Sequence, residues 1–349
     1  MGGYSNQILL ISKVFRRLCK VFKNSIGINC IWLSGLNILK TPYIWGMLYP
    51  KNQIEFEKSF STDKQCLDYL FGLKYEQGFK CSACSHSECW VNVRGILICK
   101  KCKQETSIIA NTVFHGSRIP IHLLFRILWF VVIQKVGVSA LSVQKILGIK
   151  RYATVWEWLH KFRRIMVLPS REKLSGIIEV DETFVGGTRK GKRGRGAEGK
   201  LIVIIAVELV QKHTGRIRVD IIENADRKCI NEFLKNNIQI GSTIVTDGWA
   251  GYADVKKMKY NHQIETKTMS ENGENLTPHV HKISSLLKRW LLGTHQNYTS
   301  DEYLAYYLDE YAFRYNRRNA KSRGLLFYIL LKQAILNKPV YHNKNDEVA

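Results

Sequence analysis

The chain has 349 residues, which is long enough for two or three domains with cores of their own. Lysine and arginine number 53 against 29 aspartates and glutamates, and the formal charge of +24 favours a polyanionic partner, either nucleic acid or an acidic membrane surface. Four of the nine cysteines form two close pairs, and an odd total in this arrangement argues against a disulfide framework and for a metal site in a reducing compartment.

Residues 1–55 read as a basic extension, because the first 54 residues contain neither Asp nor Glu. Apolar residues between Ile11 and Phe22 recur at helical spacing with lysines and arginines between them, a pattern that suits a membrane surface or DNA. No uncharged run reaches the roughly 20 apolar residues that span a bilayer. A signal peptide is disfavoured, because the charges follow the apolar stretch instead of preceding it. We expect a poorly ordered extension and no membrane association, with a transit peptide as the weaker alternative.

Residues 56–118 are predicted to form a helix over residues 60–78 and then a zinc ribbon. Two CxxC pairs separated by fourteen residues lie in this region: Cys81 and Cys84, then Cys99 and Cys102. Two such knuckles on neighbouring hairpins offer four thiolates in a tetrahedron, which is the closed shell of a structural zinc site. The module is too small to bury a core of its own and would need the metal to fold. His86 and Cys89 are expected to be bystanders, and a redox role for the pairs is the weaker alternative.

Residues 119–170 read as a helix-turn-helix in which Ser139 caps the first helix, Leu147 ends it and Gly148 supplies the turn. The second helix has a predicted core stripe of Val155, Leu159 and Phe162. Outside that stripe we place Tyr152 and four basic residues: Arg151, Lys161, Arg163 and Arg164. Basic residues on a second helix after a glycine turn suit contact with a DNA major groove, for which we select Arg151, Lys161 and Arg164. An ordinary helical pair with solvated charges is the alternative.

Residues 171–337 are predicted to form a core of strands followed by helices. Five β-branched, apolar runs mark the strands: GIIEVDETF, KLIVIIAVELV, GRIRVDIIEN, STIVTD and HQIETK. One helix, residues 225–237, follows the third strand. Helical periodicity returns from His279 and continues through Leu336, and residues 338–349 form a tail.

Two of the predicted strands end in an aspartate, Asp181 on the first strand and Asp247 on the fourth. A single aspartate at a strand end is more often a cap or turn residue. Two of them on neighbouring strands could hold Mg²⁺ ions that bridge a phosphate, with one ion activating water or a 3′-hydroxyl and the other stabilising the leaving oxygen. The strand order and this pair together favour a metal-dependent phosphodiester chemistry.

The segment 60–326 resembles bacterial insertion-sequence transposases of the DDE superfamily that carry an N-terminal zinc ribbon. The resemblance is carried by these motifs: CSAC and CKKC, the helix-turn-helix stretch, VDETFVGG, TDGWAGY, LLKRWLLGTHQ and YLDEYAFRYNRR. It implies an α/β (α+β) fold with a ribonuclease H-like core, DNA cleavage at transposon ends and joining to target DNA. It also implies Asp181 and Asp247 as ligands of Mg²⁺ or Mn²⁺, terminal inverted repeats and target DNA as partners, a homodimer or larger assembly on DNA, and a cytoplasmic, nucleoid-associated location.

The chain departs from that family at the third ligand, which is usually a glutamate on a helix after the core strands, with a basic residue two turns later. The matching positions hold His281, 34 residues after Asp247, and Lys288, seven residues further. Neutral imidazole binds metals but prefers softer ions than Mg²⁺. We therefore predict that His281 is the third ligand and makes Mn²⁺ more effective than Mg²⁺, with an inactive copy as the alternative. Weaker candidates are the loop residues Glu271 and Glu274, and His279 is expected to be a flanking residue.

Further basic residues are candidates for DNA contact. Lys288 and Arg289 lie on the same predicted helix as His281. The segment 186–200 has six glycines and six basic residues against one glutamate, and Arg193 and Arg195 are its predicted contacts. Three late arginines would meet a DNA groove or partner carboxylates: Arg314, Arg317 and Arg318, on a helix whose core stripe is Tyr307, Leu308 and Tyr311. Two aromatic residues after the second aspartate are assigned to the core: Trp249 and Tyr252.

The functional alternatives are a noncatalytic DNA-binding protein derived from a transposase and a structure-specific ribonuclease H-like nuclease.

Overall fold

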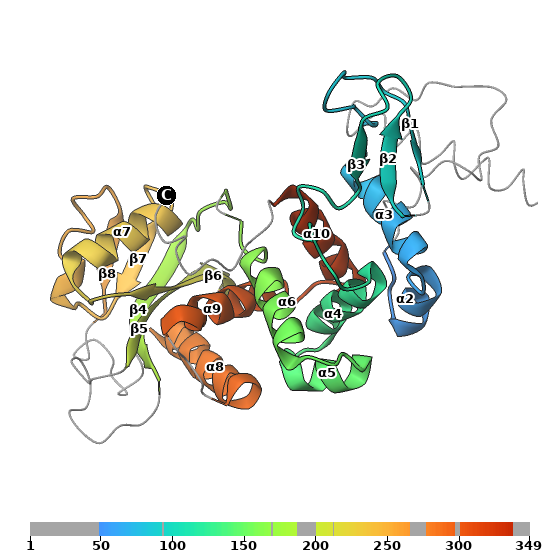
Figure 1. The fold of residues 1–349 in the computed structure, drawn as a ribbon. Helices are drawn as coiled ribbons and strands as arrows, with labels where there is room; N and C mark the ends of the chain where they lie inside the picture. The colour runs from blue at the N-terminus through green and yellow to red at the C-terminus, as the bar shows by residue number, and fades with distance from the viewer. Residues whose placement is uncertain are drawn as a thin grey trace, which may run out of the picture. The chain divides into compact units, whose positions relative to one another are not determined.

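A computed structural model describes these residues: 49–92, 94–168, 170–186, 200–211, 213–265, 277–296 and 301–337 (Figure 1). The fold is mixed α/β, as predicted, and the described part of the chain contains a three-stranded and a five-stranded sheet. No helix in these ranges has the length and apolar character that crossing a bilayer requires. Several predictions lie outside the described residues: those for residues 1–48 and 338–349, and those for Arg193, Arg195, Glu271 and Glu274.

Two helices and the small sheet come first in the chain: α2 (Gln53–Ser59), α3 (Asp63–Lys74), β1 (Cys89–Val91), β2 (Ile96–Cys99) and β3 (Glu105–Ser107). The sheet is antiparallel with β2 in the centre. Thr62 and Gln65 form a capping box that starts α3. Helical structure begins earlier than we predicted, since α2 starts inside residues 1–55 and buries Phe56 completely.

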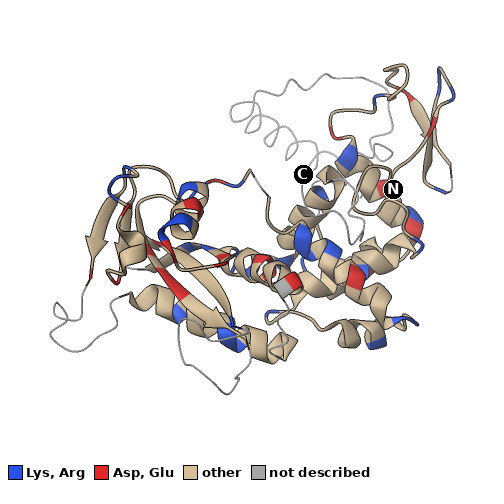
Figure 2. Ribbon diagram, turned by 60° about the vertical axis from the view of Figure 1, so that its left-hand side comes forward, with Lys and Arg blue, Asp and Glu red and all other residues tan. Residues whose placement is uncertain are grey.

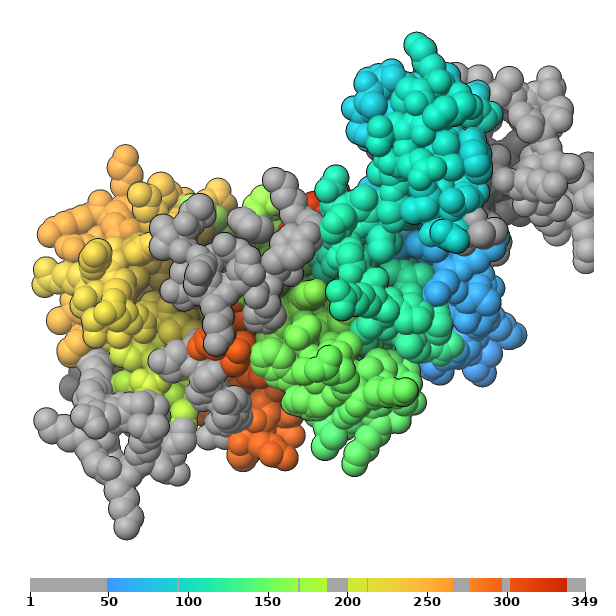
Figure 3. Space-filling view, in the orientation of Figure 1, coloured from blue at the N-terminus to red at the C-terminus, as the bar shows by residue number. Residues whose placement is uncertain are grey.

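The next three helices contain the predicted helix-turn-helix: α4 (Ile121–Ile133), α5 (Ala140–Leu147) and α6 (Tyr152–Arg164). The predicted boundaries are confirmed, because Ser139 Oγ accepts the N–H of Ser142 at 3.1 Å and Gly148 has the left-handed φ of 63°. The predicted stripe of α6 is confirmed as well, with Val155, Leu159 and Phe162 fully or almost fully buried. In Figure 3, α5 and α6 form one continuous green surface.

One hydrophobic core joins these helices to the zinc-ribbon region and to the C-terminal helix α10 (Arg323–Leu336). Phe56 stacks on Trp129 with ring centroids 4.7 Å apart, and Phe327 of α10 packs edge-on against both rings. The segments that we predicted as 56–118 and 119–170 therefore share a core, and the end of the chain completes it.

The five-stranded sheet consists of β4 (Ile177–Val185), β5 (Leu201–Val210), β6 (His213–Ile222), β7 (Thr243–Thr246) and β8 (Asn261–Ile264). Its order is β6-β5-β4-β7-β8. β5 is antiparallel to β4 and β6, whereas β7 is parallel to β4 and β8 to β7. The first and fourth strands of this domain are therefore neighbours, which is the ribonuclease H-like arrangement that the sequence predicts.

Helices cover both faces of this sheet (Figure 1): α7 (Arg227–Asn237) on one face, and α8 (Pro278–His295) with α9 (Asp301–Asn316) on the other. The apolar run in β5 reflects this burial, because residues 203–207 are all fully buried. Side chains alternate between the faces, so that Ile204 packs towards α7 and Ile205 towards α8 and α9. The predicted stripe of α9, with Tyr307 and Leu308, is confirmed as part of this core.

Candidate active site

Asp181 lies inside strand β4, and the prediction that it ends its strand is wrong. β5 pairs with the whole of β4, from Ile177 to Val185. β7, in contrast, pairs with β4 only as far as Glu179 opposite Val245. Asp181 thus comes two residues after the last parallel pair, at the point where β4 loses one of its two neighbours.

Asp247 follows β7 directly and lies on an exposed turn. The register pairs Glu179 with Val245, so Asp181 and Asp247 each follow that last pair by two residues. The turn is tight, with Gly248 at a φ of +84° and the Trp249 N–H donating to Asp247 Oδ1 at 3.0 Å. The two aspartates therefore come from neighbouring parallel strands at one edge of the pairing.

His281 lies in the first turn of α8 and points towards Asp181. Its Nε2 is 3.7 Å from Asp181 Oδ2, while the Asp181 side chain is 17% exposed and that of His281 is 48% exposed. The other oxygen of Asp181, Oδ1, accepts the N–H of Glu182 at 2.8 Å. The structure thus brings together an aspartate and a histidine that are 100 residues apart in the sequence.

A contact that sequence reasoning missed holds the start of α8 on β4. The buried carboxylate of Glu179 accepts the backbone N–H groups of His279 and Val280, each at 2.9 Å, and the Nδ1–H of His279 at 2.7 Å. We predicted His279 to be a flanking residue, but its ring is fixed by Glu179. A glutamate inside an apolar strand was the available signal, because a buried carboxylate requires donors.

Lys288 lies near the carboxylate of Asp181 and also near Lys200. Lys288 is two helical turns beyond His281, and Lys200 precedes β5. Desolvation by surrounding protein atoms lowers the pKa of the Lys288 ammonium, Lys200 lowers it further, and Asp181 opposes the change. Figure 2 shows basic residues on α8 and acidic residues on the sheet that it covers. Arg289, the other predicted contact on α8, is exposed.

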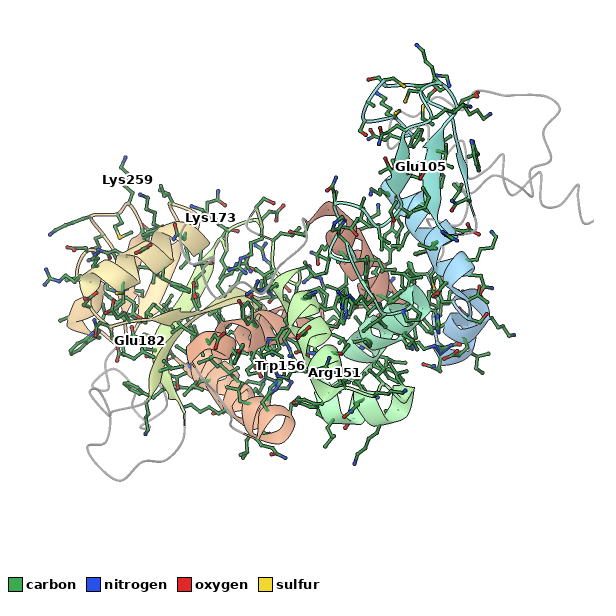
Figure 4. The ribbon with its side chains drawn as sticks, viewed as in Figure 1. Glu105, Arg151, Trp156, Lys173, Glu182 and Lys259 are labelled. Atoms are coloured by element: carbon green, nitrogen blue, oxygen red, sulfur yellow. The ribbon has the colours of Figure 1, made fainter. Side chains whose placement is uncertain are left out.

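The opposite face of β4 carries Glu182, which is labelled in Figure 4. Its Oε1 accepts the hydroxyl of Tyr252 at 2.6 Å. Burial, Glu182 and the two aspartates raise the pKa of Tyr252 well above its ordinary value, so the phenol stays protonated. Tyr252 belongs to the core as predicted, but Trp249 does not: 38% of it is exposed, and its Nε1 donates to the carbonyl of Ala225 at 3.0 Å.

The donor set of this site suits a divalent cation, because carboxylate oxygens are hard ligands and imidazole binds ions that are softer than Mg²⁺. Neighbouring ligands of an octahedral ion with bonds of about 2.0–2.1 Å are separated by about 3 Å. The 3.7 Å between His281 and Asp181 needs a closure of less than about 1 Å to reach that separation. Asp247 lies further from the other two side chains. Among the described residues, the four ribbon cysteines are the only group of three or more candidate ligands whose atoms all lie within 4.8 Å of one another.

The four predicted zinc ligands form one cluster: Cys81, Cys84, Cys99 and Cys102. Two Sγ–Sγ distances, Cys81–Cys102 and Cys84–Cys99, are both 3.6 Å. Tetrahedral Zn–S bonds of about 2.3 Å imply about 3.8 Å between sulfurs, so the spacing fits zinc. Backbone N–H groups of each knuckle lower the pKa of the Cys81 thiol and lower that of Cys99 to about 6, whereas the neighbouring cysteines and burial raise the pKa of Cys102 to about 12.

The predicted DNA contacts of α6 have different environments. Arg151 is exposed at the start of the helix (Figure 4), and the Lys161 ammonium lies 4.6 Å from the centre of the Trp158 ring. Arg164 is partly buried and donates to the hydroxyl of Tyr306. The prediction that Arg163 points outwards is wrong, because α9 covers this side of α6 and Arg163 is buried in an ion pair with Glu310.

The three late arginines bond within the protein. Arg314 is paired with Glu310 and donates to the carbonyl of Gln134. Arg318 donates to the carbonyls of Gly215 and Tyr315. Arg317 lies 4.2 Å from the centre of the Phe313 ring. The prediction that Arg314 and Arg318 are available to a DNA groove or a partner is therefore wrong, since both guanidiniums are used to fasten α9 to its neighbours.

The sheet order is that of a ribonuclease H-like domain, with Asp181 on β4 and Asp247 directly after its parallel neighbour β7. Residues 173–316, from just before β4 to the end of α9, match the family model described as the ISXO2-like transposase domain. This segment is therefore similar to insertion-sequence transposases of the DDE type. No curated protein matches the chain.

Proposed function

We propose that the protein cleaves phosphodiester bonds at transposon ends and joins them to target DNA, with Asp181, Asp247 and His281 holding the divalent ions. The observation that carries this proposal is the 3.7 Å distance between His281 Nε2 and Asp181 Oδ2. Asp181 is on β4, which pairs in parallel with β7, and Asp247 follows β7. A DDE enzyme needs a third ligand close to its first aspartate, and this approach supports His281 in that role.

Mg²⁺ or Mn²⁺ bound there would activate water for cleavage and a 3′-hydroxyl for joining, and would stabilise the leaving oxygen. The protein groups hold and orient the reactants. Asp181 presents Oδ2 while the N–H of Glu182 fixes its Oδ1. Lys288, near Asp181, and Lys200, near Lys288, would bind phosphates of the DNA beside the reacting bond. Histidine in place of glutamate replaces a hard oxygen ligand by a softer nitrogen, which favours Mn²⁺ over Mg²⁺.

DNA recognition is assigned to the helix-turn-helix and to basic residues near the site. Arg151 is the exposed cation at the start of α6, Lys161 lies partly exposed against the Trp158 ring, and Arg164 is held by Tyr306 and should contribute less. Lys288 and Arg289 extend the basic surface along α8. The zinc ribbon is structural, since its four thiolates leave no open position on the metal. Assembly on paired transposon ends as a homodimer or larger complex follows from the need to join two ends to one target.

The test is a strand-transfer assay with matched inverted-repeat ends, run in Mg²⁺ and in Mn²⁺. We expect products in wild type, more with Mn²⁺, and none in Asp181→Asn or His281→Ala. The control is His115→Ala, which removes an equally exposed imidazole from outside this domain. Full activity of His281→Ala would overturn the ligand assignment.

The same assay separates the alternative functions. DNA binding without product in either metal would indicate a noncatalytic DNA-binding protein. Cleavage of branched DNA without inverted repeats and without joined products would indicate a nuclease.

A further inference from the structure

Glu179 is a buried carboxylate whose donors all belong to the first turn of α8. Its side chain is 5% exposed, and its donors are two backbone N–H groups and the ring of His279, 100 residues away in the chain. The first N–H groups of a helix lack partners within the helix, and a carboxylate placed there also meets the positive end of the helix dipole. Glu179 is therefore the N-terminal anchor of α8, supplied by the sheet instead of by the preceding loop.

This anchor is one of two polar contacts that flank the predicted metal ligands. Glu179, Asp181 and Thr183 alternate along β4 and so face α8 together. Towards the other end of this row, Ser284 Oγ donates to Thr183 Oγ1 at 2.8 Å, and both side chains are buried. The pair of Asp181 and His281 lies between these two hydrogen-bonded contacts.

Apolar burial alone does not fix the register of α8 on β4. Val280, Ile283 and Leu287 are buried beneath the helix and hold it on the sheet, but the attraction between apolar groups is non-directional. Hydrogen bonds have narrow ranges of length and angle, and therefore limit how far the helix can slide or rotate. The Glu179 contacts lie in the turn that carries His281, so they act on that side chain first.

We infer that Glu179 and His279 form a positioning pair that sets the distance between His281 and Asp181 and thereby the affinity of the site for its metal. This inference rests on the proposed function. Glu179 and His279 touch neither DNA nor the ion in this arrangement and act through the placement of α8. Partners of this kind around metal ligands typically change metal affinity by about 10–100-fold when they are removed.

The test measures Mn²⁺ binding to the full-length, zinc-loaded protein without DNA, from the electron paramagnetic resonance signal of free Mn²⁺. We expect Glu179→Gln to raise the Kd by about 10-fold or more. His279→Ala keeps both backbone hydrogen bonds of the helix cap and should still raise the Kd several-fold. His279→Asn, whose amide N–H can replace Nδ1–H, should restore most of the affinity.

The matched control is Glu208→Gln on the neighbouring strand β5. Glu208 is also a buried carboxylate, and it accepts from Arg216 at 2.8 and 2.9 Å and from the Ser175 N–H at 3.2 Å, away from Asp181. Its substitution should lower stability and leave the Kd for Mn²⁺ unchanged. A Kd within twofold of wild type in both Glu179→Gln and His279→Ala would overturn the inference, and so would an equal loss of affinity in Glu208→Gln.

Failure of the proposed function gives a different result. Wild type that binds no Mn²⁺ beyond what Asp181→Asn binds would overturn the metal site itself. If Glu179→Gln fails to fold, the comparison of His279→Ala with His279→Asn still decides the inference, because neither variant alters the carboxylate or the backbone cap.

Discussion

Substitution of Glu310 tests the buried ion network that joins α6 to α9. Glu310 is 1% exposed, and its carboxylate contacts Arg163 Nε at 2.7 Å and Arg314 Nη2 at 2.6 Å. Burial alone would raise its pKa, but Arg314 and Arg163 lower that pKa to about 2. The difference between this pKa and the ordinary carboxyl pKa corresponds to a stabilising free energy of about 3 kcal/mol. Removing the charge also leaves two guanidiniums buried without their anion, which typically costs about 3–5 kcal/mol. We expect Glu310→Gln to lower the free energy of unfolding at pH 7 by about 3–4 kcal/mol.

The pH dependence of that loss has a defined sign. A carboxyl pKa that is lower in the folded state stabilises the protein above the unfolded pKa of about 4.5, and this contribution fades as the pH falls towards 2. The difference between wild type and Glu310→Gln should therefore be about 1 kcal/mol smaller at pH 4 than at pH 7.

Urea unfolding followed by tryptophan fluorescence at the two pH values measures both quantities. The control is Asp68→Asn, which breaks the pair of Lys64 and Asp68. That pair has the same 2.7 Å contact, but its side chains are 76% and 56% exposed, and the loss should be at most about 0.5 kcal/mol. A loss below about 1 kcal/mol in Glu310→Gln, or a loss that does not change with pH, would refute the reasoning.

Cys99→Ser should lose the zinc and lower the melting temperature, because zinc binding supplies folding energy to the ribbon. Native mass spectrometry measures the zinc content, and one zinc per chain in this variant would contradict the site. His281→Glu restores a hard oxygen ligand, so the ratio of cleavage rates in Mn²⁺ and Mg²⁺ should fall several-fold, and an unchanged ratio in the strand-transfer assay would count against His281 as a ligand. Gly148→Ala should cost about 1 kcal/mol in urea unfolding, because its φ of 63° is left-handed and the added Cβ meets no atom within 4 Å that could offset the strain. Equal stability of that variant would mean that the turn adopts another conformation.

The elements that the sequence predicts well are those whose signals are local. Ser139 and Gly148 lie directly at the ends of α5, and the cap and the left-handed turn need only neighbouring residues. The zinc cluster is local in the same sense, since each CxxC forms its own knuckle. The strand order depends on longer range pairing, but uninterrupted β-branched runs such as that of β5 are typical of strands buried on both faces.

The predictions that failed depend on partners far along the chain. The sequence predicts Arg163 to be a surface residue of α6. It is buried because it pairs with Glu310, which lies 147 positions later in the chain. Asp181 reads as a strand end because the apolar run stops there, yet β5 extends the pairing to Val185. His279 could not be linked to Glu179 without knowing that α8 crosses β4 at that point. In each case the deciding contact belongs to the packing of elements, and not to the pattern within one element.

The exposure of position 281 gives a physical reason why a histidine can replace the usual glutamate without disturbing the fold. Its side chain is 48% exposed, whereas α8 packs on the core through Val280, Ile283 and Leu287. Asp181, at 17% exposure within a strand paired by β5, has far less room for change. The anchoring carboxylate of Glu179 is present and fully bonded, and so is the contact of Ser284 with Thr183. A chain that had lost its site by decay would have no physical need to retain a buried, charged anchor that costs desolvation energy. If His281 is the third ligand, as we propose, the histidine changes the chemistry of one ligand on an intact frame, and the change should show in the metal preference.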